Sequence, residues 1–236
     1  MEDHLWCIDQ CHHAGVKAMT TVFTRGVISE LETMDWDAIK VASYDCASFP
    51  LLSDLKNRFK KLFVSTGATF DEEIEKAAKI LQGTDTTFLH CVTIYPTPLN
   101  LLDLSRINYL KKFSKKVGFS DHSLVSRDGI KAAAAAIHFG AEVVERHFTI
   151  LKADETKDGP VSITPELLKD LVAVSRMTSK DLNTYIKENV PEYETMLGNS
   201  RRELSAEELL NRDYYRGRFA TKTKGGRTVY NWEDTL

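Results

Sequence analysis

Two short stretches of the chain combine histidine with other polar side chains that could do chemistry. Residues 118–123 read Gly-Phe-Ser-Asp-His-Ser, residues 145–149 read Glu-Arg-His-Phe-Thr, and each stretch continues a short apolar run. The alanine-rich segment 130–138 between them predicts a helix. Ligands bind at the C-terminal ends of parallel strands, and two neutral imidazoles can share one divalent cation. His122 and His147 therefore indicate a metal site, and two unrelated structural histidines are the alternative.

Strand-like and helix-like segments alternate along most of the chain. Apolar runs typical of buried strands begin near residues 17, 38, 61, 87, 116 and 142, with helical periods between them. Such repeats predict parallel strands joined by right-handed crossovers. Six units are visible, whereas a closed (β/α)8 barrel needs eight. The pattern predicts an open α/β sheet or a barrel that lacks two units, with a final helix from Pro165 to about Tyr185.

Composition narrows the class of protein. The 236 residues, 42% of them apolar, suit one α/β domain with a sizeable core. The formal charge of −3 gives no basic surface for nucleic acid or for a membrane. No apolar run approaches the roughly 20 residues of a membrane span, and the N-terminus does not resemble a signal peptide. We expect a cytoplasmic protein with reduced cysteines at positions 7, 11, 46 and 91.

Polar residues also follow the other expected strands. Lys40 lies inside a run of isoleucine, valine and alanine, where its ammonium group must reach either water or an anion. Hydroxyl groups and glycine-turn amides beside a lysine suit a phosphate and a carboxylate. For any single serine or threonine, turn formation is the alternative. The residues concerned are Ser43, Asp45, Ser65, Thr66, Thr93 and Tyr95.

Five motifs, in this order, resemble those of the sialic acid synthase family. Its members include N-acetylneuraminate, legionaminate and pseudaminate synthases and spore-coat polysaccharide proteins. The resemblance spans about residues 1–175. The motifs are Lys40-Val-Ala-Ser43, Ser65-Thr-Gly67, His90-Cys-Val-Thr-Ile-Tyr95-Pro-Thr97, Gly118-Phe-Ser-Asp-His122 and Glu145-Arg-His-Phe-Thr149.

The resemblance implies a TIM (β/α)8-type barrel that condenses phosphoenolpyruvate with an N-acylated amino sugar such as N-acetylmannosamine. The product would be a nine-carbon 2-keto sugar acid for surface carbohydrate biosynthesis, with release of phosphate. A divalent metal, Mn²⁺ or Mg²⁺, would be held by His122 and His147. These two histidines and Asp45 would be catalytic; Asp45 stands where many members carry glutamate. The substrate-binding residues would be Lys40, Ser43, Ser65, Thr93, Tyr95, Ser120 and Asp158.

Two parts of the family pattern have no match in this sequence. They are the first two βα units, with a glutamate and a Lys-Phe-Gln motif, and the C-terminal antifreeze-like domain with its arginine. We therefore expect residues 1–198 to form barrel units three to eight. Residues 199–236 would form a C-terminal tail, either docked or loosely ordered. The family is usually dimeric, and the shorter tail leaves a homodimer open.

Two other functions compete with the synthase. One is a Schiff-base aldolase that would use Lys40, although both histidine motifs would then have no role in the reaction. The other is a truncated, non-catalytic remnant that binds the sugar or phosphoenolpyruvate. The sequence identifies neither the acyl group of the sugar nor whether the sugar is phosphorylated at position 6.

Overall fold

A computed structural model describes residues 2–216, 218–222 and 225–233. In this part of the chain, seven strands follow one another in the sheet in sequence order. The pairings β1–β2, β2–β3, β5–β6 and β6–β7 are parallel, which confirms the predicted α/β class. The strands are β1 (Met19–Val22), β2 (Ala38–Val41), β3 (Lys61–Ser65), β4 (Asp85–Cys91), β5 (Lys116–Asp121), β6 (Val143–Phe148) and β7 (Ser162–Ile163). The two-residue strand β7 was not predicted, because so short a pairing leaves no periodic signal.

The chain divides into two compact units. The first contains the described residues up to Thr87 and those from Leu209 onward, and the second is Phe88–Glu208. The first unit is therefore built from both ends of the chain, and the second from one continuous segment. The predicted division into 1–198 and 199–236 stays a prediction.

The first unit has a core of fully buried aliphatic side chains, including Ile39 and Val41 on β2 and Leu62 and Val64 on β3. Because side chains alternate along a strand, Lys40 lies on the opposite face of β2 from Ile39 and Val41. Helix α3 packs on α4. The helices of this part are α1 (Glu2–His13), α2 (Ile28–Leu31), α3 (Phe49–Arg58) and α4 (Asp71–Ile80), with 3-10 turns at Arg25–Val27 and Ser43–Asp45.

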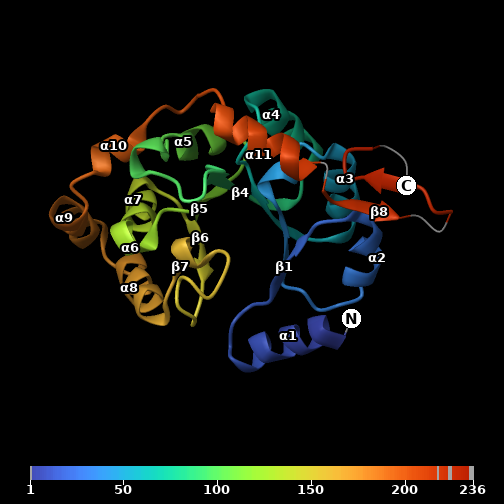
Figure 1. The fold of residues 1–236 in the computed structure, drawn as a ribbon, viewed down its shortest axis with the longest axis horizontal. Coiled ribbons are helices and arrows are strands. Elements are labelled where there is room, and N and C mark those ends of the chain that lie inside the picture. Colours follow the sequence, from blue (N-terminus) through green and yellow to red (C-terminus); the bar gives the residue numbers. More distant parts are fainter. Residues whose placement is uncertain (1, 217, 223–224, 234–236) are drawn as a thin grey trace. The chain divides into compact units, whose positions relative to one another are not determined.

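The C-terminal tail completes the first unit. Helix α11 (Ala206–Arg216) is followed by the antiparallel pair β8 (Ala220–Lys222) and β9 (Thr228–Tyr230). Figure 1 shows α11 running beside α4, and the guanidinium of Arg212 is paired with the Glu73 carboxylate of α4. Strand β8 contacts the 3-10 turn Arg25–Val27. Of the two alternatives for the tail, the docked one therefore holds over its described residues from 209 onward.

The second unit is organised around α7 (Lys131–Phe139). Five consecutive alanines, 132–136, are fully buried, so α7 can pack against β5 and β6 and also against α8, α9 and α10. The other helices of this unit are α5 (Arg106–Leu110), α6 (Val125–Asp128), α8 (Pro165–Ser175), α9 (Ser179–Asn189) and α10 (Tyr193–Leu197), with 3-10 turns at Leu99–Leu101 and Gly159–Val161.

The expectation of one long helix from Pro165 to Tyr185 is wrong. Helix α8 ends at Ser175, and Thr178 begins α9 by accepting a hydrogen bond from the Asp181 amide at 3.2 Å. A threonine with an acidic residue three positions later is a helix-start signal that the continuous apolar pattern concealed. Within the described ranges, no helix has the length and apolarity required to cross a bilayer.

Gly118 on β5 provides a test of the packing in the second unit. A Cβ atom at this position would lie 2.5 Å from both Leu89 Cδ2 and the Val143 carbonyl oxygen, so Gly118→Ala must push strands apart. We expect the free energy of unfolding to fall by about 1–3 kcal/mol in urea unfolding followed by circular dichroism. Lys116→Ala, at an exposed position on the same strand, should change it by less than about 0.5 kcal/mol. Equal stability of the two variants would contradict this packing.

Candidate active site

The register of β5 against β6 aligns the two histidine motifs residue by residue. Ser120 lies opposite Glu145, and Asp121 lies opposite Arg146. One step further along the same register, His122 lies beside His147. Since side chains alternate between the two faces of a sheet, the histidine pair shares its face with Ser120 and Glu145, and Asp121 and Arg146 lie on the other face.

The structure brings the two histidine rings together. Their centroids are 5.2 Å apart, with an angle of 58° between the ring planes. His122 is buried at 4% exposure, whereas the His147 side chain is 33% exposed. The pair therefore has one solvent-accessible side, as a site that admits a ligand requires.

Three further residues of the second unit surround this pair. The ring of Tyr95 lies 4.0 Å from that of His122 and 6.3 Å from that of His147, centroid to centroid. Cys91 Sγ is 3.7 Å from His122 Nδ1, and Asp158 Oδ2 is 3.9 Å from His147 Nδ1. The contact from Cys91 orients the His122 ring and indicates Nε2 as its ligating nitrogen, whereas Asp158 is too far from His147 for a hydrogen bond.

The pair fits two ligands of one metal ion. With metal–nitrogen distances of about 2.1 Å, two imidazoles on one cation have ring centroids roughly 5 Å apart. In the described part of the chain, no group of three or more His, Cys, Asp and Glu side chains is arranged as a metal site. Two protein ligands suit an ion that takes its remaining ligands from substrate and water.

A buried ion pair holds the opposite face of the same two strands. Arg146 Nη1 lies 2.5 Å from Asp121 Oδ2, and the two side chains are 4% and 0% exposed. Asp121 Oδ1 also accepts a hydrogen bond from the Ser123 amide at 2.8 Å, and Arg146 donates to Ser123 Oγ at 3.1 Å. This network fixes the backbone on either side of His122. On the histidine face, Ser120 Oγ donates to Glu145 at 3.1 Å.

The first unit contains a second group of the predicted residues. Lys40 is half-buried on β2, Ser43 opens the 3-10 turn that Asp45 closes, and Ser65 ends β3. Ser65 Oγ is buried, and no residue that the structure describes accepts or donates a hydrogen bond there. A buried hydroxyl without a partner is unusual and suits a site that binds a polar ligand.

Asp45 is buried and doubly hydrogen-bonded. Its Oδ1 accepts from Ser48 Oγ at 2.8 Å and from Asn231 Nδ2 at 3.0 Å. Burial raises the pKa of Asp45 above its ordinary value of 3.8, and the two hydrogen bonds and the charge of Arg216 offset part of the increase. A carboxyl group in this state exchanges a proton more readily at moderate pH than an exposed one.

His90, a motif residue in β4, is buried and has the surroundings of a residue that supports the fold. Its Nε2 donates to the Leu102 carbonyl at 2.6 Å, and burial lowers the pKa of the ring to about 3. Thr93, which follows the same strand, is fully buried.

Sequence reasoning did not single out Glu145, Cys91 or Asn231 as contributors to these sites. For Glu145 a signal was present, because it belongs to one of the histidine motifs. For Asn231 there was none, since 186 residues separate it from Asp45.

The parallel strands, with polar side chains at their C-terminal ends, define an α/β protein of the TIM-barrel type. Within that class, the chain belongs to the NeuB family, whose model matches residues 1–187. This match confirms the resemblance found in the sequence.

Several curated relatives support the assignment. The chain is 33% identical to "Uncharacterized protein MJ1065" of Methanocaldococcus jannaschii over 85% of its length and 60% of that protein. It is 30% identical to the spore coat polysaccharide biosynthesis protein SpsE of Bacillus subtilis over 91% of its length and 58% of that protein. It is 29% identical to a pseudaminic acid synthase of Campylobacter jejuni over 94% of its length and 60% of that protein. The chain thus spans about 60% of the length of these relatives.

The crystal structure of SpsE from Bacillus subtilis has the same fold. It superposes with a TM-score of 0.73 at 28% identity, covering 85% of this chain and 56% of that one.

Removing one partner of the buried ion pair should strongly reduce the stability of the fold. Asp121→Asn leaves Arg146 charged and unpaired in the interior, so we expect a loss of about 3–5 kcal/mol in the free energy of unfolding. Glu192→Gln is the control, because it breaks the partly exposed pair with Lys131 in the same unit and should cost less than about 1 kcal/mol. Both values come from urea titrations. Similar losses in the two variants would show that the buried pair contributes no more to stability than the partly exposed one.

The raised pKa of Asp45 has a consequence for stability. Between pH 3.8 and its folded-state pKa, the unfolded chain has released this proton and the folded chain retains it, so rising pH reduces stability. Asp45→Asn removes that contribution. The stability of the variant relative to the natural chain should therefore increase as pH rises from 3.8 and become constant above the folded-state pKa. Thermal unfolding across pH 3.5–8 measures this difference, and a difference that does not vary with pH would show that the pKa is not raised.

Proposed function

We propose that this chain contributes barrel units three to eight of a sialic-acid-type synthase. The reaction would join C3 of phosphoenolpyruvate to the aldehyde carbon of an N-acylated amino sugar. Water adds at C2, and phosphate leaves by C–O cleavage to give a nine-carbon 2-keto sugar acid. The observation that carries the proposal is the histidine pair aligned at the ends of β5 and β6, in a chain that matches the NeuB family over 187 residues.

His122 and His147 would hold the divalent cation that polarises the sugar aldehyde. The adjacent rings support this role, and the contact between Cys91 Sγ and His122 Nδ1 leaves Nε2 of His122 for a ligand. Nitrogen ligands suit a transition-metal ion better than Mg²⁺, which favours oxygen, so Mn²⁺ is the expected ion.

Binding of phosphoenolpyruvate would use cationic and hydroxyl groups. Lys40 would contact the carboxylate as a point charge. Ser43, Ser65 and Ser120 would hydrogen-bond the phosphate, with a weaker contact from Thr93. The unpartnered Ser65 hydroxyl supports this assignment.

The sugar would lie against Tyr95 and Asp158. Tyr95 is 46% exposed and packs on His122, and the Asp158 side chain is 53% exposed, so both can contact a ligand from solvent. Asp45, with its raised pKa, would exchange a proton with the reacting groups.

The test is release of phosphate from phosphoenolpyruvate, measured with and without N-acetylmannosamine and Mn²⁺. Release should require both and stop when the metal is chelated. His122→Ala and His147→Ala should each lower kcat/KM by more than about a hundredfold, since each removes a metal ligand. His13→Ala, an exposed histidine in α1, should have no effect.

The alternatives predict other results. Binding of the substrates without turnover at saturating Mn²⁺ would favour a non-catalytic remnant and contradict the proposal. A pyruvate adduct trapped on Lys40 by borohydride would favour a Schiff-base aldolase.

A further inference from the structure

We propose that the C-terminal tail supplies a positioning residue, Asn231, that orients the carboxyl group of Asp45 in the same chain. The proposal rests on the proposed function in assigning a proton-transfer role to Asp45. It adds that this part of the site depends on residues far beyond the last segment matched by the family model, which ends at residue 187.

The hydrogen bonds of Asn231 are specific to an amide side chain. Its Nδ2 donates both of its hydrogens, one to Asp45 Oδ1 at 3.0 Å and one to the Phe23 carbonyl at 3.1 Å. The residue is 1% exposed, so neither bond competes with bulk water. Because the Phe23 carbonyl is part of the backbone just after β1, the amide group links the carboxyl group of Asp45 to the sheet.

These bonds leave the two carboxyl oxygens of Asp45 in different surroundings. The hydrogen bonds from Asn231 and from Ser48 both reach Oδ1. A carboxyl group held at one oxygen has a fixed rotamer, and its second oxygen is directed toward a defined position. Such orientation is what a proton-transferring group needs, because transfer requires hydrogen-bond distance to the reacting atom.

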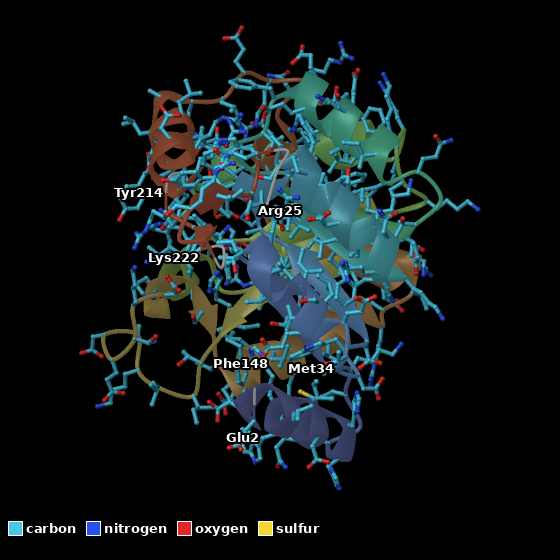
Figure 2. The ribbon with its side chains drawn as sticks, turned by 90° about the vertical axis from the view of Figure 1, so that its right-hand side faces the viewer. Glu2, Arg25, Met34, Phe148, Tyr214 and Lys222 are labelled. Carbon is cyan, nitrogen blue, oxygen red and sulfur yellow. The ribbon has the colours of Figure 1, made fainter. Side chains whose placement is uncertain are left out.

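The tail that carries Asn231 is fixed to the first unit at several points. Arg212 donates to the Ala68 carbonyl at 2.6 Å, and Thr221 Oγ1 accepts from the Gly26 amide at 2.7 Å. Arg25, labelled in Figure 2 together with Lys222 of β8, donates to the Glu233 carbonyl.

Aromatic contacts strengthen the attachment. Tyr215 stacks on Tyr44, the residue directly before Asp45, with ring centroids 4.3 Å apart and planes at 15°. Phe219 contacts Phe23 at 5.0 Å. The tail is thus attached beside both Phe23 and Asp45, the two residues that Asn231 links, and can hold Asn231 in place.

The charged groups around Asp45 come from α11 and α4. Arg216 of α11 acts on it directly. Arg212 and Asp213 of α11 and Glu73 of α4 act on Arg216 in turn. Cys46 follows Asp45 in the chain. Burial keeps the pKa of the Cys46 thiol near 12, so this group stays neutral while Asp45 titrates. The hydrogen bond from Asn231 stabilises the ionised carboxylate and opposes the effect of burial.

The first experiment does not depend on turnover. The side-chain carboxyl ¹³C shift of Asp45, assigned with Asp45→Asn, is followed against pH by NMR. Asn231→Ala should raise the pKa of Asp45 further, because one donor to the carboxylate is lost. Thr221→Val removes a different tail hydrogen bond and should leave the pKa where it was. An unchanged pKa in Asn231→Ala would overturn the proposal, even if the protein proved to have no synthase activity.

The second experiment separates positioning from structural support. In the exchanged pair Asp45→Asn with Asn231→Asp, an amide and a carboxylate still face each other and can restore stability. The carboxylate is then at position 231 instead of 45, where it cannot transfer the proton, so the rate of phosphate release should stay at least about tenfold below that of the natural chain. Asn231→Ala should show a similar loss in kcat, with its pH profile displaced upward. Recovery of activity in the exchanged pair would show that Asn231 is only structural.

If the natural chain releases no phosphate at all, the proposed function fails and the NMR titration still decides the role of Asn231. If the chain is active and the titration is unaffected by Asn231→Ala, the proposed function stands and the inference fails.

Discussion

The ion pair between Asp121 and Arg146 is the interaction on which the histidine site depends. Two nearly inaccessible charges lie 2.5 Å apart across β5 and β6. Taking such charges out of water is costly, so the pair is tolerated only in a geometry with further hydrogen bonds, here to Ser123. A slip of one residue between β5 and β6 would place the two charges on opposite faces, without each other as partners, and would likewise separate His122 from His147. The charges therefore enforce the register that places His122 beside His147.

Sequence reasoning succeeded where the position of an element follows from local periodicity. The ends of β5 and β6 could be located because an apolar run, a polar motif and an alanine-rich helix recur in order. The apolar run around Lys40 was likewise recognised as a strand, and the structure places Lys40 in β2. It failed where the periodic signal is too short or is concealed: β7 consists of two residues, and Thr178 interrupts a helix without interrupting the apolar pattern. It also failed where a contact is non-local. Nothing in the sequence near Asn231 indicates that its partner lies 186 residues earlier.

Histidine and serine motifs alone do not distinguish site residues from structural ones. His90 lies in β4, His122 directly follows β5, and both belong to motifs of the same family, yet their environments differ. His90 donates to a backbone carbonyl and has a pKa near 3, so it remains neutral throughout the physiological range. His122 instead lies beside a second imidazole and an exposed tyrosine ring. Burial and the identity of the neighbours decide the role, and both depend on the tertiary structure.

The discontinuity of the first unit affects how the protein is made. Residues 88–208 are contiguous and can become compact as soon as they leave the ribosome, whereas the first unit needs residues from both ends of the chain. Its N-terminal segment can pack against the residues from Leu209 onward only after these have been synthesised. Such long-range closure is slow compared with local folding. Nascent chains of this protein thus pass through an interval in which binding by a chaperone would be most valuable.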